Sequence, residues 1–190
     1  MLIVFHKPFG VLSQFTADQP GQTTLADFGF PREVWPIGRL DMDSEGLLLL
    51  SDEKALVDRL LNPRSKQAKT YYAQVEGIPS PKALHRLSNG SLEVKGHRCL
   101  PAQAAVLTPP PPIPPRTPPI RVRAKIPDTW ISLTLTEGKN RQVRRMTAAV
   151  GHPTLRLIRI AIGNLTLEGI NPGEWTQLPT QRRKLLGLRE

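Results

Sequence analysis

The chain has 190 residues, enough to bury one hydrophobic core or to form two small lobes that share a sheet. Its single cysteine, Cys99, excludes an internal disulfide framework, and no cluster of histidine and cysteine has the spacing of metal ligands. The apolar runs are too short for a signal peptide or a membrane span, and the net charge of +10 favours a polyanionic partner. We therefore expect a reduced, metal-free, cytoplasmic protein that stays off the membrane.

The positive charge is concentrated in the second half of the chain. Residues 1–95 hold 11 Lys or Arg against 11 Asp or Glu, whereas residues 96–190 hold 15 against 5. We expect a face built from the second half to bind phosphate groups.

Short apolar strands alternate with a few short helices, without an internal repeat. In one strand Ile131, Leu133 and Leu135 alternate with hydroxyl side chains, a period of two that leaves one face buried. The pattern predicts an α+β fold with a bent, mainly antiparallel mixed sheet flanked by helices. The predicted strands are residues 2–6, 35–38, 47–51, 70–76, 102–107, 130–136, 155–162 and 174–178.

Four helices are predicted from their start and stop signals. Asn62-Pro63 ends a helix that begins near residue 52, and Asn89-Gly90 ends one that Ser80-Pro81 opens. A third helix spans about 141–150, with Gly151 as its C-terminal cap, and a fourth lies near 180–186.

The segment GRLDMDSEGLLLL at 38–50 contains the strongest signal for chemistry, because a turn places Asp41 between an arginine and an apolar strand. Asp41, Asp43, Glu45, Gly46 and Asp52 have the spacing of a calcium-binding loop. Such a loop joins two helices, whereas a leucine-rich strand occupies its second half here, so we reject that interpretation. An ordinary turn role for Asp41 is the remaining alternative to catalysis.

Five segments, taken in chain order, resemble those of pseudouridine synthases. Within that family the chain is most similar to the group that modifies large-subunit ribosomal RNA. The segments are HKPFGVLSQF at 6–15, Gly38-Arg39-Leu40-Asp41 with 46–50, Lys69-Thr70-Tyr71 with AQVEG, GKNRQVRRM at 138–146, and LRLIRIAIGNLTLEGINPGEW at 155–175.

The resemblance implies that residues 1–190 form a single catalytic domain around a central cleft, without the separate N-terminal RNA-binding domain of many relatives. The implied activity is the isomerisation, without a cofactor, of one uridine of 23S ribosomal RNA in the peptidyl-transferase region. The implied enzyme is a monomer. The alternative is a noncatalytic ribosomal RNA-binding or assembly factor with the same fold.

The resemblance also assigns three catalytic residues. Asp41 is the implied nucleophile on a flipped-out base, as carboxylates act in glycoside chemistry, and the alternatives are that it attacks the sugar, attacks the base or helps to form a glycal. Arg144 is the implied cation that keeps this carboxylate charged, and Tyr71 is the implied aromatic wall beneath the base, with a hydroxyl that can transfer a proton. An ordinary core tyrosine is the alternative role for Tyr71.

RNA contacts are assigned to six basic residues, and no metal site is assigned. Arg39 is expected to fill the gap left by the extruded nucleotide, unless it only pairs with an acid such as Asp43. On the third helix, Arg141, Arg144 and Arg145 are expected to share one broad face, which for Arg141 and Arg145 fits a merely solvated surface equally well. The six RNA-binding residues are Arg39, Lys69, Lys139, Arg141, Arg145 and Arg182.

Eight prolines lie between residues 109 and 119, where they prevent a helix or a sheet interior. This excursion is either a stiff surface connection or an arm that contacts RNA through Arg116 and Arg121.

Overall fold

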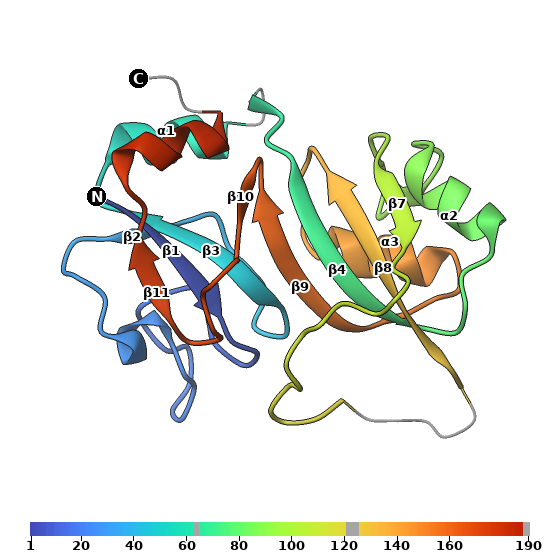
Figure 1. Cartoon of the computed structure of the whole chain (residues 1–190), viewed down its shortest axis with the longest axis horizontal. Coiled ribbons are helices and arrows are strands. Elements are labelled where there is room, and N and C mark those ends of the chain that lie inside the picture. Colours follow the sequence, from blue (N-terminus) through green and yellow to red (C-terminus); the bar gives the residue numbers. More distant parts are fainter. Residues whose placement is uncertain (63–64, 121–125, 188–190) are drawn as a thin grey trace. The chain divides into compact units, whose positions relative to one another are not determined.

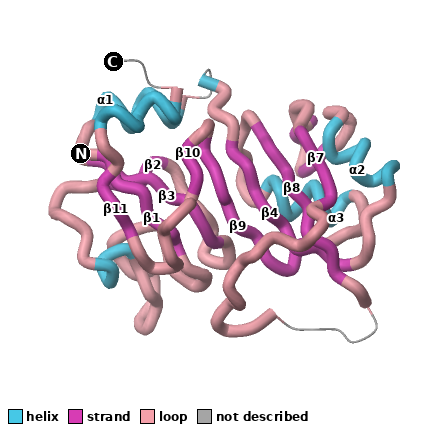
Figure 2. Tube along the Cα trace, in the orientation of Figure 1, coloured by secondary structure: helices cyan, strands magenta, loops and turns pink. Residues whose placement is uncertain are grey.

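The computed structural model of the protein describes residues 1–62, 65–120 and 126–187 (Figures 1 and 2). The chain divides into two compact units. The first holds residues 1–67 together with the chain from Ile158 onward, and the second holds residues 68–157. Strand β9 (Thr154–Ile162) begins in the second unit and continues in the first.

The first unit is built around β3 (Glu45–Ser51), in which all seven residues are buried. β1 (Leu2–Lys7) pairs antiparallel with β3 along its whole length, and β11 (Trp175–Gln177) covers the other edge of β1. β2 (Trp35–Ile37) also pairs antiparallel with β3. Among the described strands only β9 runs parallel to β3, through the pairs Glu45 with Ile158 and Gly46 with Arg159. β10 (Leu165–Thr166) pairs antiparallel with β9.

Apolar side chains cover both faces of this sheet. On one face, α1 (Lys54–Leu61) and the C-terminal 3-10 helix (Thr180–Leu186) lie together (Figure 1). Leu56, Leu60 and Leu186 join them to one cluster with the strands. On the other face, the buried ring of Phe5 meets Phe28 and Phe30 at centroid distances of 4.9 and 5.0 Å. These contacts explain why the run of four leucines at 47–50 is buried on both sides.

The second unit contains the antiparallel strands β4 (Lys69–Glu76), β8 (Asp128–Leu135) and β7 (Gln103–Val106), in that order. In β8, Ile131, Leu133 and Leu135 are buried while the residues between them are half-exposed. The unit also contains α2 (Pro81–Ser88), α3 (Gln142–Ala149) and a hairpin of β5 (Glu93–Val94) and β6 (His97–Arg98). Ser80 caps α2 by accepting a hydrogen bond from the Ala83 N–H at 3.2 Å.

The α+β class, the mainly antiparallel sheet and all eight predicted strands are confirmed. The predicted helices are confirmed as well, except that the segment near 180–186 is a 3-10 helix. Three two-residue strands (β5, β6 and β10) and the 3-10 helix Leu25–Phe28 were not predicted, because such short segments carry no periodicity. Pro63 lies outside the described residues.

The proline-rich excursion is tied to the second unit by arginine contacts. The buried side chain of Arg156 donates from Nη1 to the Pro114 carbonyl at 2.8 Å. Arg116 donates to the carbonyls of Pro118 and Pro119 at 2.8 and 3.2 Å. These contacts favour the stiff connection over the RNA-contacting arm for Arg116, and Arg121 lies outside the described residues.

Within the described ranges, every helix is too short or too polar to cross a membrane.

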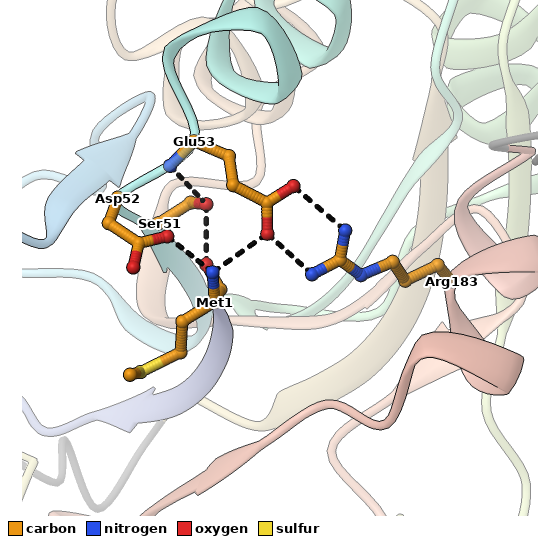
Figure 3. Close-up of polar contacts among 5 residues, drawn as sticks. All are labelled: Met1, Ser51, Asp52, Glu53 and Arg183. Atoms are coloured by element: carbon orange, nitrogen blue, oxygen red, sulfur yellow. Dashed lines mark hydrogen bonds and ion pairs between the residues drawn. The ribbon is translucent and has the colours of Figure 1, made fainter.

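A polar cluster joins the start of β1 to α1 and to the C-terminal 3-10 helix (Figure 3). The N-terminal ammonium of Met1 contacts Asp52 and lies 2.7 Å from a Glu53 oxygen. Arg183 donates two hydrogen bonds to Glu53, at 2.6 and 2.9 Å. The Arg183 guanidinium, followed by the ammonium of Met1, lowers the pKa of Glu53 to about 2, although partial burial opposes this shift.

The Glu53 cluster should make folding sensitive to acid. Because the folded-state pKa is depressed, its stabilisation is present above the unfolded value of about 4.3 and is lost as the pH falls toward 2. Arg183→Ala should therefore lower the melting temperature at pH 6, by an amount that shrinks below pH 4. Arg182→Ala is the control, because Arg182 is exposed on the same helix and should melt like the wild type. Equal losses in both variants would show that the cluster contributes nothing specific.

Gly46 allows β3 and β9 to approach each other. Its φ is +107°, and a Cβ atom at this position would lie 2.3 Å from the carbonyl oxygen of Arg159 and 2.7 Å from its backbone nitrogen. Any side chain would therefore push against the β9 backbone as well as straining its own.

Gly46→Ala should lower the free energy of unfolding by more than about 3 kcal/mol, since strain and overpacking each cost on the order of 1–3 kcal/mol. Gly10→Ala is the matched control, because Gly10 has a φ of +81° but open space around its Cβ position. Its cost should be limited to about 1–2 kcal/mol of backbone strain. Urea denaturation of both variants measures the difference, and similar losses would contradict the role of close packing at Gly46.

Candidate active site

Asp41 lies in the loop between β2 and β3, in the first unit. Its carbonyl accepts a hydrogen bond from the Ser44 N–H at 3.0 Å, so residues 41–44 form a tight turn at the entry to β3. Asp41 is half-buried, whereas its neighbour Leu40 is buried and anchors the loop in the unit. The loop therefore presents the predicted nucleophile from a fixed backbone.

Ser13 fixes the backbone directly before Asp41. Its buried hydroxyl donates to the Leu40 carbonyl at 2.8 Å and accepts from the Leu40 N–H at 3.1 Å. On the other side of Asp41, the Gly10 N–H donates to the Met42 carbonyl at 2.8 Å. Residues 10–13 thus hold the loop that carries Asp41 at both of its neighbours, Leu40 and Met42.

Lys7 supports these same residues from inside the unit. Its side chain is fully buried, and Nζ donates to the carbonyls of Val11 at 2.7 Å and Pro8 at 3.0 Å. Burial lowers the pKa of Lys7 to about 8, against the raising effect of the carboxylates of Glu45, Asp43 and Asp41. A buried cation therefore supports the segment 8–11, which in turn bonds to the loop that carries the predicted nucleophile.

Two further charged side chains are buried beside Lys7. Glu45 and Arg159 are 3% and 4% exposed, and Arg159 Nε donates to the Leu47 carbonyl at 2.8 Å. The sequence analysis identified neither the pair nor Lys7 as support for the loop. The available signals were charged residues within otherwise apolar strands, at the end of β1, the start of β3 and the middle of β9.

The rejected calcium loop has no counterpart in the fold. Glu45–Ser51 is a strand, and the carboxylate of Asp52 contacts the N-terminal ammonium. Within the part of the chain that the structure describes, no three His, Cys, Asp or Glu residues are grouped so that they could hold a metal ion.

Tyr71 lies in β4 of the second unit, opposite Leu133 of β8. Tyr71, Ala73 and Val75 are buried, while the residues between them are half-exposed. The predicted strand face is confirmed, and Tyr72 lies on the opposite face. Tyr71 is 9% exposed, so most of its ring packs inside the unit.

Arg144 lies in α3, where its Nη1 donates to the Thr154 carbonyl at 3.3 Å. The Thr147 hydroxyl bonds to that of Thr154 at 2.7 Å and so joins the same helix to β9. Arg145 instead donates to the Asn140 side chain at 2.6 Å. Arg141 precedes the helix as its N-cap, with a left-handed φ of 52°. The expectation that the three arginines share one helical face is therefore wrong for Arg141.

Glu137 holds the turn that leads into α3. It accepts hydrogen bonds from the Leu100 N–H at 2.9 Å, from His97 at 2.8 Å and from the Gln142 side chain. Burial raises the pKa of Glu137, but these three donors outweigh it and keep that pKa below the usual value. Gln142 also accepts from the Lys139 N–H at 3.0 Å. The sequence analysis did not identify this network, since nothing local connects residues 97–100 to residue 137.

The remaining predicted RNA contacts are distributed over both units. Lys139 and Arg141 are exposed in the turn before α3, and Lys69 is half-buried at the start of β4. Arg182 is exposed on the C-terminal 3-10 helix. Arg39 is exposed and donates to the Gln14 side chain at 2.8 Å.

The contacts within each unit bring some of the predicted residues together. Arg39 and Asp41 share one loop, and the segment 137–145 gathers Lys139, Arg141, Arg144 and Arg145. Asp41 belongs to the first unit and Tyr71 and Arg144 to the second, so their meeting in one cleft stays a prediction.

Comparisons with known proteins define the class. Residues 1–149 match the sequence profile of the family described as RNA pseudouridylate synthase. A solved structure described as a pseudouridylate synthase shares the fold with a TM-score of 0.78 and 24% identity, covering 97% of this chain and 73% of that one. The chain belongs to the RNA pseudouridine synthase family and is an isomerase that converts uridine in RNA to pseudouridine.

Relatives found by sequence indicate a particular group within this family. A ribosomal large subunit pseudouridine synthase E from Xanthomonas axonopodis pv. citri (strain 306) is 54% identical over 173 residues, 90% of each chain. One of the same name from Vibrio vulnificus (strain CMCP6) is 49% identical over 93% of this chain and 74% of its own length. These relatives confirm the similarity to large-subunit synthases, in particular to synthase E, that the motifs indicate.

The buried Lys7 should produce a measurable pH dependence of stability. Because its pKa is about 8 when folded and about 10.4 when unfolded, the unfolded chain binds more protons between these values. Stability contributed by this group therefore rises with pH in that window. The variant Lys7→Met keeps the apolar stem. Its free energy of unfolding, measured with urea, should increase less between pH 7.5 and pH 9.5 than that of the wild type. Lys82→Met, at an exposed position of α2, should retain the full increase. An unchanged increase in Lys7→Met would contradict the assignment.

Proposed function

We propose that this chain isomerises one uridine of 23S ribosomal RNA, in the peptidyl-transferase region, with Asp41 as nucleophile on a flipped-out base. The observation that supports the substrate is the 54% identity over 90% of both chains with a relative named ribosomal large subunit pseudouridine synthase E. The motif and the fixed, half-buried position of Asp41 support the assignment of the nucleophile.

The reaction breaks the bond between the ribose and N1 of uracil, turns the base while it stays bound, and rejoins it through C5. At the end C5 loses its proton and N1 gains one, so the RNA keeps the same atoms apart from protons exchanged with solvent. A carboxylate can start this sequence by attack or by stabilising positive charge on the sugar. Hydrogen bonds from Ser13 to Leu40 and from Gly10 to Met42 fix the backbone on both sides of Asp41. This supports a catalytic role that requires a fixed position of the carboxylate.

Arg144 and Tyr71 complete the proposed catalytic set. A guanidinium near a carboxylate favours its charged form, and Arg144 is held in α3 by Thr154. The ring of Tyr71 is a rigid apolar group on β4 whose small exposed part is suited to contact an unstacked uracil, and its hydroxyl can transfer a proton. No cofactor enters this mechanism.

Phosphate binding is proposed for six basic residues that are exposed or half-buried. Lys139 and Arg141 lie in the turn that Glu137 fixes, and Arg39 lies in the same loop as Asp41. Lys69, Arg145 and Arg182 are the remaining proposed contacts. The whole charge excess lies in residues 96–190, which supports a phosphate-binding surface from that half.

Asp41→Asn should abolish turnover while RNA binding persists, because the change removes the nucleophilic oxygen at almost constant volume. Asp43→Asn is the matched control, since Asp43 is a half-buried acid on the same loop and should retain most activity. Tritium release from 23S ribosomal RNA labelled at uridine C5 measures the reaction. Full tritium release by Asp41→Asn would contradict the assignment of Asp41 as the nucleophile. Release by the wild type from other RNA but not from 23S RNA would contradict the proposed substrate.

A further inference from the structure

Trp35 is exposed at an unusual place for a large aromatic side chain. It begins β2, pairs with Ser51 of β3, and is 64% exposed. Its neighbour Ile37 on the same short strand is 5% exposed and belongs to the core of the first unit. The strand is therefore firmly attached, while the indole remains largely accessible to solvent.

A row of aromatic rings supports the indole from inside. Phe15 meets Trp35 edge to face, with centroids 6.4 Å apart and planes at 81°. Phe15 also contacts Phe30 at 6.2 Å, and Phe30 contacts the fully buried Phe5 at 5.0 Å. Such contacts restrict the orientation of the indole without covering it. A ring held in this way loses little conformational entropy when a ligand stacks on it.

A series of contacts that includes the pair of Phe15 and Trp35 connects Trp35 to the loop that carries Asp41. Four pairs run antiparallel along the segments 10–15 and 35–42. They are Phe15 with Trp35, Gln14 with Arg39, Ser13 with Leu40, and Gly10 with Met42. The segment 35–42 exposes Trp35 at one end, Arg39 in the middle, and Met42, which is 46% exposed, next to Asp41. Asp41 lies six positions after Trp35, so the two Cα atoms are at most about 22 Å apart.

We propose that Trp35 is a stacking platform for an unpaired base of the substrate RNA, a few nucleotides away from the uridine that reacts at Asp41. The proposal rests on the function proposed above for Asp41. Every nucleobase has a π-face, so an exposed indole binds single-stranded RNA with little dependence on sequence. The exposed guanidinium of Arg39 lies between the two positions and is suited to an intervening phosphate. This charge favours RNA over a protein partner as the ligand of the indole.

The test measures the affinity of the full chain for a single-stranded, uridine-rich RNA decamer. The decamer carries one 2-aminopurine, whose fluorescence reports binding. Trp35→Ala should weaken binding about 5- to 150-fold, which corresponds to one base stack, whereas Trp35→Phe keeps a ring and should stay within about threefold of the wild type. Ile78→Ala, at a position that is 72% exposed in the second unit, should bind like the wild type. The melting temperature of Trp35→Ala should remain close to that of the wild type.

Tryptophan fluorescence provides a second readout that does not depend on the alanine variant. RNA should quench the wild type, and the quenching should largely disappear in Trp35→Phe, although Trp130 and Trp175 remain. On 23S RNA, Trp35→Ala should raise KM and leave kcat unchanged. Asp41→Asn should bind the decamer with wild-type affinity, so failure of the nucleophile assignment can be distinguished from failure of the platform. Wild-type RNA affinity in Trp35→Ala, or quenching that persists in Trp35→Phe, would overturn the proposal.

Discussion

The close approach of two backbones at Gly46 determines the arrangement of the first unit. Gly46 pairs with Lys7 of β1 on one side and with Arg159 of β9 on the other, and β9 runs parallel to β3. Because no side chain fits between Gly46 and β9, the start of β3 is fixed, and with it the turn 41–44 that enters the strand. The position of Asp41 thus depends on a contact in which its own side chain takes no part.

Buried polar groups then convert this fixed backbone into a rigid loop. Lys7 satisfies two carbonyls of the segment 8–11, and that segment and Ser13 bond to the backbone on both sides of Asp41. Burying an ammonium is costly, and nearby carboxylates offset part of that cost. In the second unit, Glu137 fixes the turn before α3 through three donors. Both units therefore use charged side chains, fully buried at Lys7 and largely buried at Glu137, to hold loops that carry proposed functional residues.

The surface around the loop that carries Asp41 combines aromatic and cationic side chains. Trp35, Arg39 and Met42 are exposed along one segment whose backbone the neighbouring residues 10–15 hold in place. Proteins that bind single-stranded nucleic acids combine both kinds of contact, since phosphates bind cations and unpaired bases stack on rings. The proline-rich excursion differs from this surface, because the guanidinium of Arg116 donates hydrogen bonds to carbonyls of its own segment.

The sequence by itself determined the α+β class, the eight longer strands, the face of β4 on which Tyr71 lies, and the family. These features depend on local periodicity, stop signals and contiguous motifs. Only the tertiary structure decided that Lys7, Glu45 and Arg159 are buried around the start of β3, and that His97 bonds to Glu137 across 40 residues of chain. It also decided that Arg141 caps α3 instead of sharing its face, and that Arg183 pairs with Glu53. The physical reason is that each of these features depends on which distant backbone lies nearby. A one-dimensional pattern reports the polarity of a side chain but not the partner that makes its burial favourable.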